Sequence, residues 1–403
     1  MEKKKMRILI ANETYPPNLN GAATFTQRLA QNLSKKGHIV AVIAPGLKFG
    51  DHLEIDNCGV AIHRVRSLPV KMVHPNFRVI VKPDIYTAVR KIVKDFKPDV
   101  IHIQNHFTLG RACIKAAEKT HTPIIGTNHF MPDNLVQFAP SFAEGTMIRV
   151  MWGDFLRVYN KLDYVTAPSK IAIKMIKDIG YDKKAEVVSN GMEFDKFKKR
   201  PVSDALLKKY KIFKNIPTFI SVGRIEKDKN LDVILEALAI YLKKHKAQLI
   251  LVGNGKFEKE FKKLAVLLKV EDRVFFTGKI SDRELREIYS LADVYIGAGT
   301  AELQGLSVME GMASGLPVLA VNAVALPELV KNGVNGYLFE LSAEDLAGKM
   351  DKILKDEKRL EKMAQESLKI ISEHDIVKTI AKFERIYEKV IEEKKKSSSK
   401  SKK

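Results

Sequence analysis

The feature that most constrains the fold is a regular alternation of short, β-branched apolar segments with longer segments of helical periodicity. In the first half, apolar segments at 8–11, 39–43, 100–103 and 123–126 alternate with helical patterns at 24–36, 85–96 and 111–119. Within residues 85–96 the apolar side chains recur at helical spacing and leave the basic side chains on the opposite face. Strand–helix–strand alternation predicts a parallel sheet with helices on both faces.

The same alternation begins again after about residue 200. Apolar segments now lie at 218–222, 248–252, 274–278, 294–296 and 317–321, with helical patterns at 231–245, 256–268, 283–292 and 307–313. We therefore expect an α/β protein of two Rossmann-like, doubly wound domains, residues 1–198 and 199–375. The helical pattern at 376–391 is expected to pack back on the first domain. In such sheets ligands gather at the carboxyl ends of strands, so both domains should border one interdomain cleft.

Charge is distributed unevenly along the chain. Of the net charge of +21, residues 1–200 carry +14, residues 201–393 carry +1 and residues 394–403 carry +6. This asymmetry indicates that the first half meets a polyanionic surface, either nucleic acid or an anionic membrane. A lysine-rich proteome is the alternative explanation. The last ten residues have no apolar side chains and are expected to be disordered.

Other features of the sequence indicate a cytoplasmic protein. No apolar run approaches the roughly 20 residues that span a bilayer. The apolar stretch 8–11 is too short for a signal peptide and fits a first strand better. The two cysteines, Cys58 and Cys113, have neither metal-site spacing nor enough companions for a disulfide framework.

Two glutamates provide the most informative motif. Glu302 precedes a glycine-containing turn, and Glu310 lies eight residues later, inside the helix that follows. Carboxylates in such places accept hydrogen bonds from sugar hydroxyls. A loop acid and a helix-surface acid are the alternative interpretation when the pair is taken alone.

A cationic motif follows the strand at 218–222. Arg224 and Lys229 lie between the carboxyl end of that strand and the start of a helix, where a guanidinium, an ammonium and a helix N-terminus together suit a phosphate. Gly253 ends the next strand in a similar way, but the sequence that follows lacks the third glycine of a dinucleotide fingerprint. For the motif with Arg224 and Lys229, the alternative interpretation is a basic loop exposed to solvent.

The first half carries two further candidate residues. Gly21 precedes a helix, where the absence of a side chain lets backbone amides approach a phosphate. His129 follows the strand at 123–126, from which an imidazole can bind a substrate or move a proton. The alternative for Gly21 is a plain turn, and the alternative for His129 is a structural role. His102 and His106 also lie near a strand end and are rival candidates for the same function.

Taken together and in order, these motifs resemble family 4 of the retaining glycosyltransferases, which have the two-domain GT-B fold. The resemblance covers the chain from about residue 7 to residue 391. It rests above all on the glutamate pair and the Gly-Met-Ala-Ser-Gly-Leu-Pro-Val segment that follows, and on Val222-Gly-Arg224 through Lys229. The segment 298–300 departs from the family pattern beside the donor sugar, which leaves the identity of that sugar open.

The resemblance implies a role for each candidate residue. Arg224 and Lys229 would hold the donor diphosphate, and Glu310 the ribose hydroxyls. Glu302 and His129 would act at the transferred sugar, and are the catalytic candidates. The remaining donor-binding candidates are Gly21, Gly253 and Leu306. The family needs neither a cofactor nor a metal, because cationic side chains neutralise the leaving diphosphate.

The segment Asn20-Gly-Ala-Ala-Thr also resembles glycolipid synthases that glucosylate diacylglycerol. We therefore expect hexose transfer from UDP-glucose to a membrane lipid, by an enzyme peripheral on the inner face of the cell membrane. Transfer to phosphatidylinositol, a polyprenyl-linked glycan or a soluble sugar is the alternative. A nucleic-acid-binding protein is a more remote alternative, because only the charge suggests it and no recognised nucleic-acid-binding motif is present.

Overall fold

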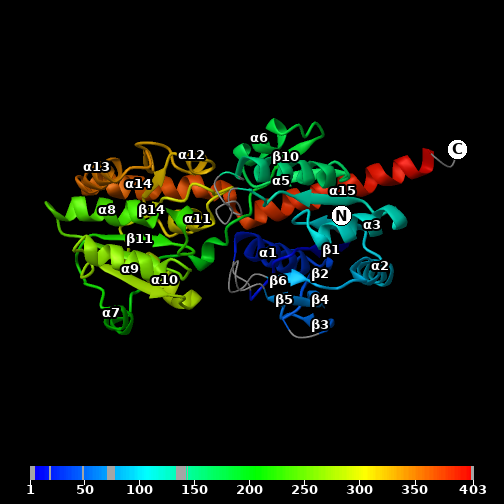
Figure 1. Ribbon diagram of the computed structural model, residues 1–403, viewed down its shortest axis with the longest axis horizontal. Helices are drawn as coiled ribbons and strands as arrows, with labels where there is room; N and C mark the ends of the chain where they lie inside the picture. Colours follow the sequence, from blue (N-terminus) through cyan, green and yellow to red (C-terminus); the bar gives the residue numbers. More distant parts are fainter. Residues whose placement is uncertain are drawn as a thin grey trace. The chain divides into compact units, whose positions relative to one another are not determined.

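The computed structural model describes residues 5–17, 20–47, 50–69, 78–132, 142 and 144–400. The chain divides into two compact units (Figure 1). Unit 1 comprises residues 1–190 and 377–403, and unit 2 comprises residues 191–376. Unit 1 therefore ends short of the predicted boundary at residue 198. Its second segment includes the helical pattern that was expected to pack back on the first domain.

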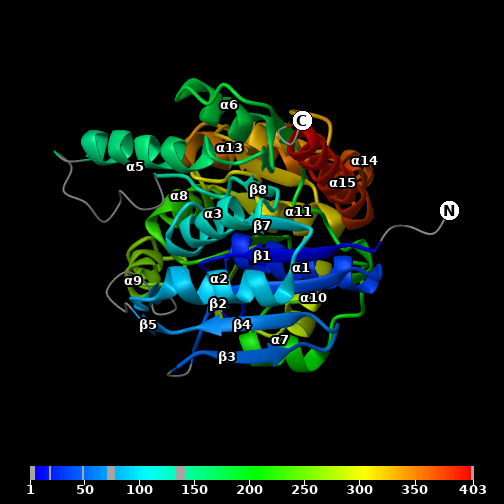
Figure 2. The ribbon, with the colours of Figure 1, turned by 90° about the vertical axis from the view of Figure 1, so that its right-hand side faces the viewer.

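Unit 1 is built on an eight-stranded sheet with the strand order β10-β9-β8-β7-β1-β2-β4-β3. Figure 2 shows β1, β2, β4 and β3 side by side in that order. Neighbouring strands are parallel except at the β3–β4 edge. The strands of this sheet are β1 Arg7–Ala11, β2 Ile39–Pro45, β3 His52–Ile55, β4 Ala61–Val65, β7 Val100–Ile103, β8 Ile124–Thr127, β9 Tyr164–Ala167 and β10 Ala185–Val187. A separate antiparallel pair joins β5 Ser67–Pro69 to β6 Arg78–Ile80.

Helices connect these strands and bury their apolar stripes against the sheet. They are α1 Gly21–Lys35, α2 Ile85–Phe96, α3 Thr108–Thr120, α5 Glu144–Tyr159, α6 Lys170–Asp178 and α15 Ile376–Lys400. The start of α1 is fixed by Asn20, whose side chain accepts a hydrogen bond from the backbone N–H of Ala23. In α2 the buried residues are Ile85, Val89 and Val93, at the spacing of one helical face.

The long helix α15, red in Figure 1, packs against unit 1 through both apolar and polar side chains. Phe383 and Tyr387 are fully buried, and the Tyr387 hydroxyl lies 2.9 Å from Nδ1 of His102. Glu384 accepts a hydrogen bond from Lys36 at 2.8 Å and lies 3.0 Å from Nε2 of His38. These contacts hold α15 within unit 1.

The same helix continues beyond the point where disorder was expected. Residues 394–400 are helical, whereas the sequence predicted a disordered tail from Lys394; residues 401–403 lie outside the described residues. No glycine or proline follows Ile391 to end the helix, and lysine is a good helix former. Lys394 also forms an ion pair with Asp163 at 2.9 Å.

Unit 2 contains a six-stranded sheet with the order β13-β12-β11-β14-β15-β16, in which all neighbouring strands are parallel. Numbered along the chain, this order is 3-2-1-4-5-6, the arrangement of a Rossmann sheet. The strands are β11 Thr218–Val222, β12 Gln248–Val252, β13 Val274–Gly278, β14 Val294–Gly297, β15 Val318–Val321 and β16 Gly336–Phe339. Helix α13 (Ala343–Leu354) packs against α8 (Leu231–Leu242), and α11 (Leu306–Ala313) packs against α14 (Glu357–Ile371).

The helices of unit 2 begin at polar caps where the sequence supplies them. Ser281 and Glu284 form a reciprocal capping box at the start of α10, for example. The helices are α7 Asp204–Tyr210, α8 Leu231–Leu242, α9 Glu258–Leu267, α10 Asp282–Leu291, α11 Leu306–Ala313, α12 Leu326–Leu329, α13 Ala343–Leu354 and α14 Glu357–Ile371. Short 3₁₀ segments are η2 Phe194–Lys196, η3 Lys227–Lys229 and η4 Ser372–His374. In the described part of the chain, no helix is long and apolar enough to cross a membrane.

Gly253 holds two strand-end loops of unit 2 together. Its φ of +133° is a conformation that side chains rarely adopt, and a Cβ at this position would lie 1.8 Å from the carbonyl oxygen of Gly223. This glycine therefore serves the packing of the loops that follow β11 and β12.

We expect Gly253→Ala to lower the free energy of unfolding by about 3 kcal/mol, because backbone must move and the φ is strained. The matched control is Gly348→Ala in α13, where an added Cβ meets nothing within 4 Å and alanine favours the helix by up to about 1 kcal/mol. Thermal unfolding of both variants checks this. Equal midpoints for the two variants would contradict the packing role of Gly253.

Candidate active site

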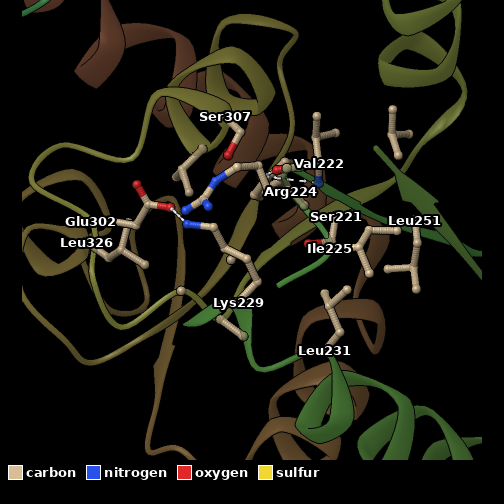
Figure 3. Close-up of a pocket in the computed structure, with 17 residues that line it drawn as sticks. Ser221, Val222, Arg224, Ile225, Lys229, Leu231, Leu251, Glu302, Ser307 and Leu326 are labelled. Atoms are coloured by element: carbon tan, nitrogen blue, oxygen red, sulfur yellow. Dashed lines mark hydrogen bonds and ion pairs between the residues drawn. The ribbon is translucent and has the colours of Figure 1, made fainter. Parts of the chain in front are cut away.

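The candidate site of unit 2 lies where the order of its strands changes direction. From β11 the chain proceeds outward through β12 and β13, and then returns to the other side of β11 to form β14, β15 and β16. Ligands of open α/β sheets bind at the carboxyl ends of strands at such a switch point. The loops after β11 and β14 meet there and line a pocket with residues that include Arg224, Lys229, Glu302 and Ser307 (Figure 3).

Two hydrogen bonds tie these loops together. The Asn230 side chain donates to the carbonyl oxygen of Ala298 at 2.7 Å, and the Thr300 N–H donates to the carbonyl oxygen of Asp228 at 3.2 Å. Asn230 adopts a left-handed conformation with φ of +47°, which asparagine tolerates better than most residues. The cationic loop after β11 is thereby fixed against the acidic loop after β14.

Three charged side chains, those of Arg224, Lys229 and Glu302, line the pocket, and Asp228 pairs with the two cations. Lys229 Nζ lies 2.6 Å from Glu302 Oε1 and 3.2 Å from Asp228 Oδ2, and Arg224 Nη2 lies 3.5 Å from the same Asp228 oxygen. In Figure 3 the side chains of Lys229 and Glu302 point toward each other, with the Arg224 guanidinium beside them. Sequence reasoning missed Asp228, although it lies inside the cationic motif that was singled out.

The charge of Lys229 is maintained by its neighbours. Burial alone would lower the pKa of its ammonium group, but the carboxylates of Glu302 and Asp228 outweigh burial, and the pKa lies above its usual value. A permanently charged ammonium beside a guanidinium is suited to bind a diphosphate. Helix α11 adds its N-terminus, because Ser307 and Val308 in its first turn also line the pocket.

The other residues predicted for this unit lie close to the pocket but do not line it. Glu310 is one turn into α11 and accepts a hydrogen bond from the Tyr289 hydroxyl at 3.2 Å. Leu306 is the first residue of the same helix. Gly253 packs against Gly223, as described above. The contact of these three residues with a donor stays a prediction.

The candidates of the first domain lie in unit 1. Gly21 is the first, exposed residue of α1. His129 follows β8; its Nε2 lies 3.0 Å from Oε1 of Gln104, and its ring centroid lies 5.1 Å from that of Phe25. Burial lowers the pKa of His129 to about 3, so the imidazole is neutral near pH 7. Contact of either residue with a donor stays a prediction.

The rival histidines are bound within the protein. In His102, Nδ1 lies 2.9 Å from the Tyr387 hydroxyl and Nε2 lies 2.7 Å from the Thr127 hydroxyl, so both ring nitrogens have internal partners. His106 is 2% exposed and packs against the rings of Phe107 and Phe130. These contacts favour His129, which is only partly buried, as the histidine that meets a substrate.

Among the residues that the structure describes, no group of three or more histidine, cysteine, aspartate or glutamate side chains is arranged to hold a metal ion. The expectation that the reaction uses no metal stays a prediction.

The sequence is similar to those of known glycosyltransferases. Residues 202–369 match the family described as glycosyl transferases group 1, and residues 19–196 match glycosyltransferase family 4. The alpha-monoglucosyldiacylglycerol synthase of Streptococcus pneumoniae is 31% identical over 350 residues, which cover 85% of this chain and 77% of that protein. The chain therefore belongs to family 4 of the glycosyltransferases, as its motifs predicted.

Other relatives are named for a different activity. A GDP-mannose-dependent alpha-mannosyltransferase of Corynebacterium glutamicum is 27% identical over 365 residues, which cover 90% of this chain and 84% of that protein.

Solved structures confirm the predicted GT-B fold of two Rossmann-like domains. Sucrose-phosphate synthase of Thermosynechococcus elongatus matches with a TM-score of 0.81 at 17% identity, covering 96% of this chain and 99% of that one. Anabaena HepE in complex with UDP and glucose matches with a TM-score of 0.74 at 20% identity, covering 94% and 99%.

The cationic pair leads to a test of nucleotide binding. We expect Arg224→Ala to weaken the affinity for UDP or GDP by roughly 10- to 100-fold, because a charge-assisted hydrogen bond contributes about 1.5–3 kcal/mol. The matched control is Arg283→Ala, which removes an exposed arginine paired with Glu287 on α10 of the same unit. Calorimetric titration with each nucleotide measures both variants. Wild-type affinity in Arg224→Ala would remove this residue from the site.

Proposed function

We propose that this glycosyltransferase moves glucose from UDP-glucose to the hydroxyl of a membrane lipid such as 1,2-diacylglycerol, with retention of anomeric configuration. The observation that carries the proposal is the group of Arg224, Lys229 and Glu302 at the switch point of unit 2. The acceptor is suggested by two relatives named alpha-monoglucosyldiacylglycerol synthase, at 31% and 28% identity.

The proposed chemistry divides the site between phosphate and sugar. Arg224 and Lys229 stabilise the charge that develops on the leaving diphosphate as the bond between the anomeric carbon and phosphate oxygen breaks. Glu302 and Glu310 bind hydroxyls of the sugar and of the ribose, respectively. The acceptor oxygen bonds to the anomeric carbon on the same face from which the leaving group departs. The proton of the acceptor hydroxyl passes to the leaving phosphate. From unit 1, Gly21 and His129 are proposed to bind donor phosphate and sugar.

A second candidate donor is GDP-mannose. It is favoured by the mannosyltransferase relatives, among which a GDP-mannose-dependent alpha-(1-6)-phosphatidylinositol monomannoside mannosyltransferase of Mycobacterium tuberculosis is 24% identical over 365 residues. The two candidates differ in base, sugar and acceptor, so one assay separates them.

The assay incubates the protein with UDP-glucose, UDP-galactose, GDP-mannose or ADP-glucose, each with and without diacylglycerol in zwitterionic vesicles. We expect UDP release with UDP-glucose, increased at least tenfold by diacylglycerol, and an α-linked product by nuclear magnetic resonance. Faster release from GDP-mannose would favour the second candidate. A β-linked product would contradict retention, and no release from any donor would contradict the proposed function.

Membrane association is a further part of the proposal. It is supported by the +14 charge of residues 1–200 and by apolar side chains that face solvent in unit 1. In α5, Phe155, Val158 and Tyr159 near its C-terminal end are buried, whereas Val150 is 65% exposed and Phe142 just before the helix is 90% exposed. Clustered basic side chains near an anionic leaflet contribute roughly 1 kcal/mol each. We propose a cytoplasmic enzyme that is peripheral on the inner face of the membrane.

We expect the protein to co-sediment with anionic vesicles at low salt and to dissociate as ionic strength rises, because the screening length falls to about 8 Å at physiological salt. Deleting residues 395–403 removes five lysines but keeps the Lys394–Asp163 ion pair, and should weaken binding without abolishing it. Zwitterionic vesicles are the control. If neither form binds anionic vesicles at low salt, a soluble acceptor becomes the better proposal.

A further inference from the structure

The sheet of unit 1 has a switch point of its own. Strand β1 lies between β7 and β2; the chain first proceeds from β1 to β2 and later returns to β7 on the other side. A ligand of this sheet is therefore expected at the carboxyl ends of β1 and β7. The residues that directly follow these strands are Asn12 and Glu13 after β1, and Gln104 and Asn105 after β7.

These two strand ends are connected by hydrogen bonds. Asn105 Nδ2 donates to Asn12 Oδ1 at 2.9 Å, and the Gln104 N–H donates to the carbonyl oxygen of Ala11 at 2.9 Å. The N–H of Leu109, in the first turn of α3, donates to Glu13 Oε1 at 2.6 Å. The Glu13 carboxyl is thus held at the junction by the helix that follows β7.

The second oxygen of Glu13 is available to a ligand. Oε2 has no hydrogen-bond partner, and no cation pairs with this carboxyl, in the part of the chain that the structure describes. The side chain is partly exposed, yet enough protein surrounds it that burial raises its pKa to about 7, against the opposing effect of the Leu109 N–H. A carboxyl desolvated without a counter-ion destabilises a fold, so its presence here favours a function.

Further polar atoms without partners lie at the same edge of the sheet. Gln104 Nε2, Asn105 Oδ1 and Asn128 Nδ2 are buried and have no hydrogen-bond partner among the described residues. Gln104 also accepts from the catalytic candidate His129, which links Glu13's side of the edge to the proposed reaction centre. Amide groups and one carboxyl, with no cation among them, match neutral hydroxyl groups better than a phosphate.

We infer that Glu13 binds the hydroxyl of an electrically neutral acceptor through its free carboxylate oxygen. This inference rests on the proposed function and narrows it. Above its pKa of about 7 the carboxyl is ionised; a glycerol or sugar hydroxyl then donates a hydrogen bond to it, whereas an anionic head group such as that of phosphatidylinositol is repelled by it. The site thereby favours a neutral acceptor, such as diacylglycerol or a soluble sugar, over phosphatidylinositol.

The test is Glu13→Gln in the full-length protein. Glutamine keeps an oxygen for the Leu109 N–H but lacks the charge, so the variant is expected to fold with an unchanged or higher thermal midpoint. With diacylglycerol in zwitterionic vesicles, we expect kcat/KM for the acceptor to fall at least tenfold, while UDP affinity changes less than twofold. The matched control is Glu118→Gln, an exposed glutamate on α3 of the same unit, which should behave as the wild type.

Three acceptors identify what the carboxylate binds. Diacylglycerol and methyl glucoside represent a lipid-borne and a free neutral hydroxyl, and the one that loses more kcat/KM on substitution is the natural class. Phosphatidylinositol tests charge: the wild type should use it at least tenfold less well than diacylglycerol. Equal or better use of phosphatidylinositol, or unchanged kcat/KM for both neutral acceptors in Glu13→Gln, would overturn the inference.

A binding measurement keeps the inference testable if no donor is turned over. Short-chain diacylglycerol is titrated calorimetrically onto the UDP-saturated protein. Binding to the wild type that weakens at least tenfold in Glu13→Gln supports the inference even where the proposed transfer reaction fails. No binding to the wild type, or equal binding to both proteins, would overturn it.

Discussion

The hydrogen-bond ladder of the parallel sheet is the constraint on which the rest of the molecule depends. Parallel strands are joined by crossover helices that cover both faces of the sheet. The strands are therefore buried on both faces and consist mainly of apolar residues. In unit 2 every residue of β12, β14 and β15 is buried. Polar side chains can therefore reach solvent or a ligand only at the ends of the strands. The order of the strands in the sheet decides which of those ends lie next to each other.

This constraint explains why charged residues that are distant in sequence share one pocket. Arg224 and Glu302 belong to loops separated by three strands and three α-helices along the chain, but β11 and β14 are neighbours in the sheet. Two cations and two carboxylates then neutralise one another within a few ångströms. Such an arrangement keeps the cations oriented before a ligand arrives, which lowers the cost of ordering them on binding.

Much of this architecture could be predicted because both of its signals are local. Apolar, β-branched segments and helical periodicity indicated the two sheets, and the motif residues Arg224, Lys229 and Glu302 were found at strand ends. Seven strands in the described part of the chain were not predicted, namely β3, β4, β5, β6, β9, β10 and β16. Of these, β3, β5 and β6 are partly exposed and lack a continuous apolar run. Sequence could not separate His129 from His102, because only tertiary contacts show that Tyr387 and Thr127 occupy both nitrogens of His102. Glu13 was missed for a similar reason, because its partner Leu109 lies far from it in the chain. Asp228 was missed although its partners Arg224 and Lys229 belong to the same motif.

The return of α15 to unit 1 has a consequence for the order in which the protein can mature on the ribosome. Phe383, Tyr387 and Val390 are buried, the first two against the ring of His102, yet they are synthesised after all of unit 2. During translation the nascent first unit must wait with this apolar surface uncovered, while unit 2 is continuous in the chain and can fold as soon as it emerges. The unit made first is thus completed last, and the exposed surface of the waiting intermediate is a natural target for chaperones.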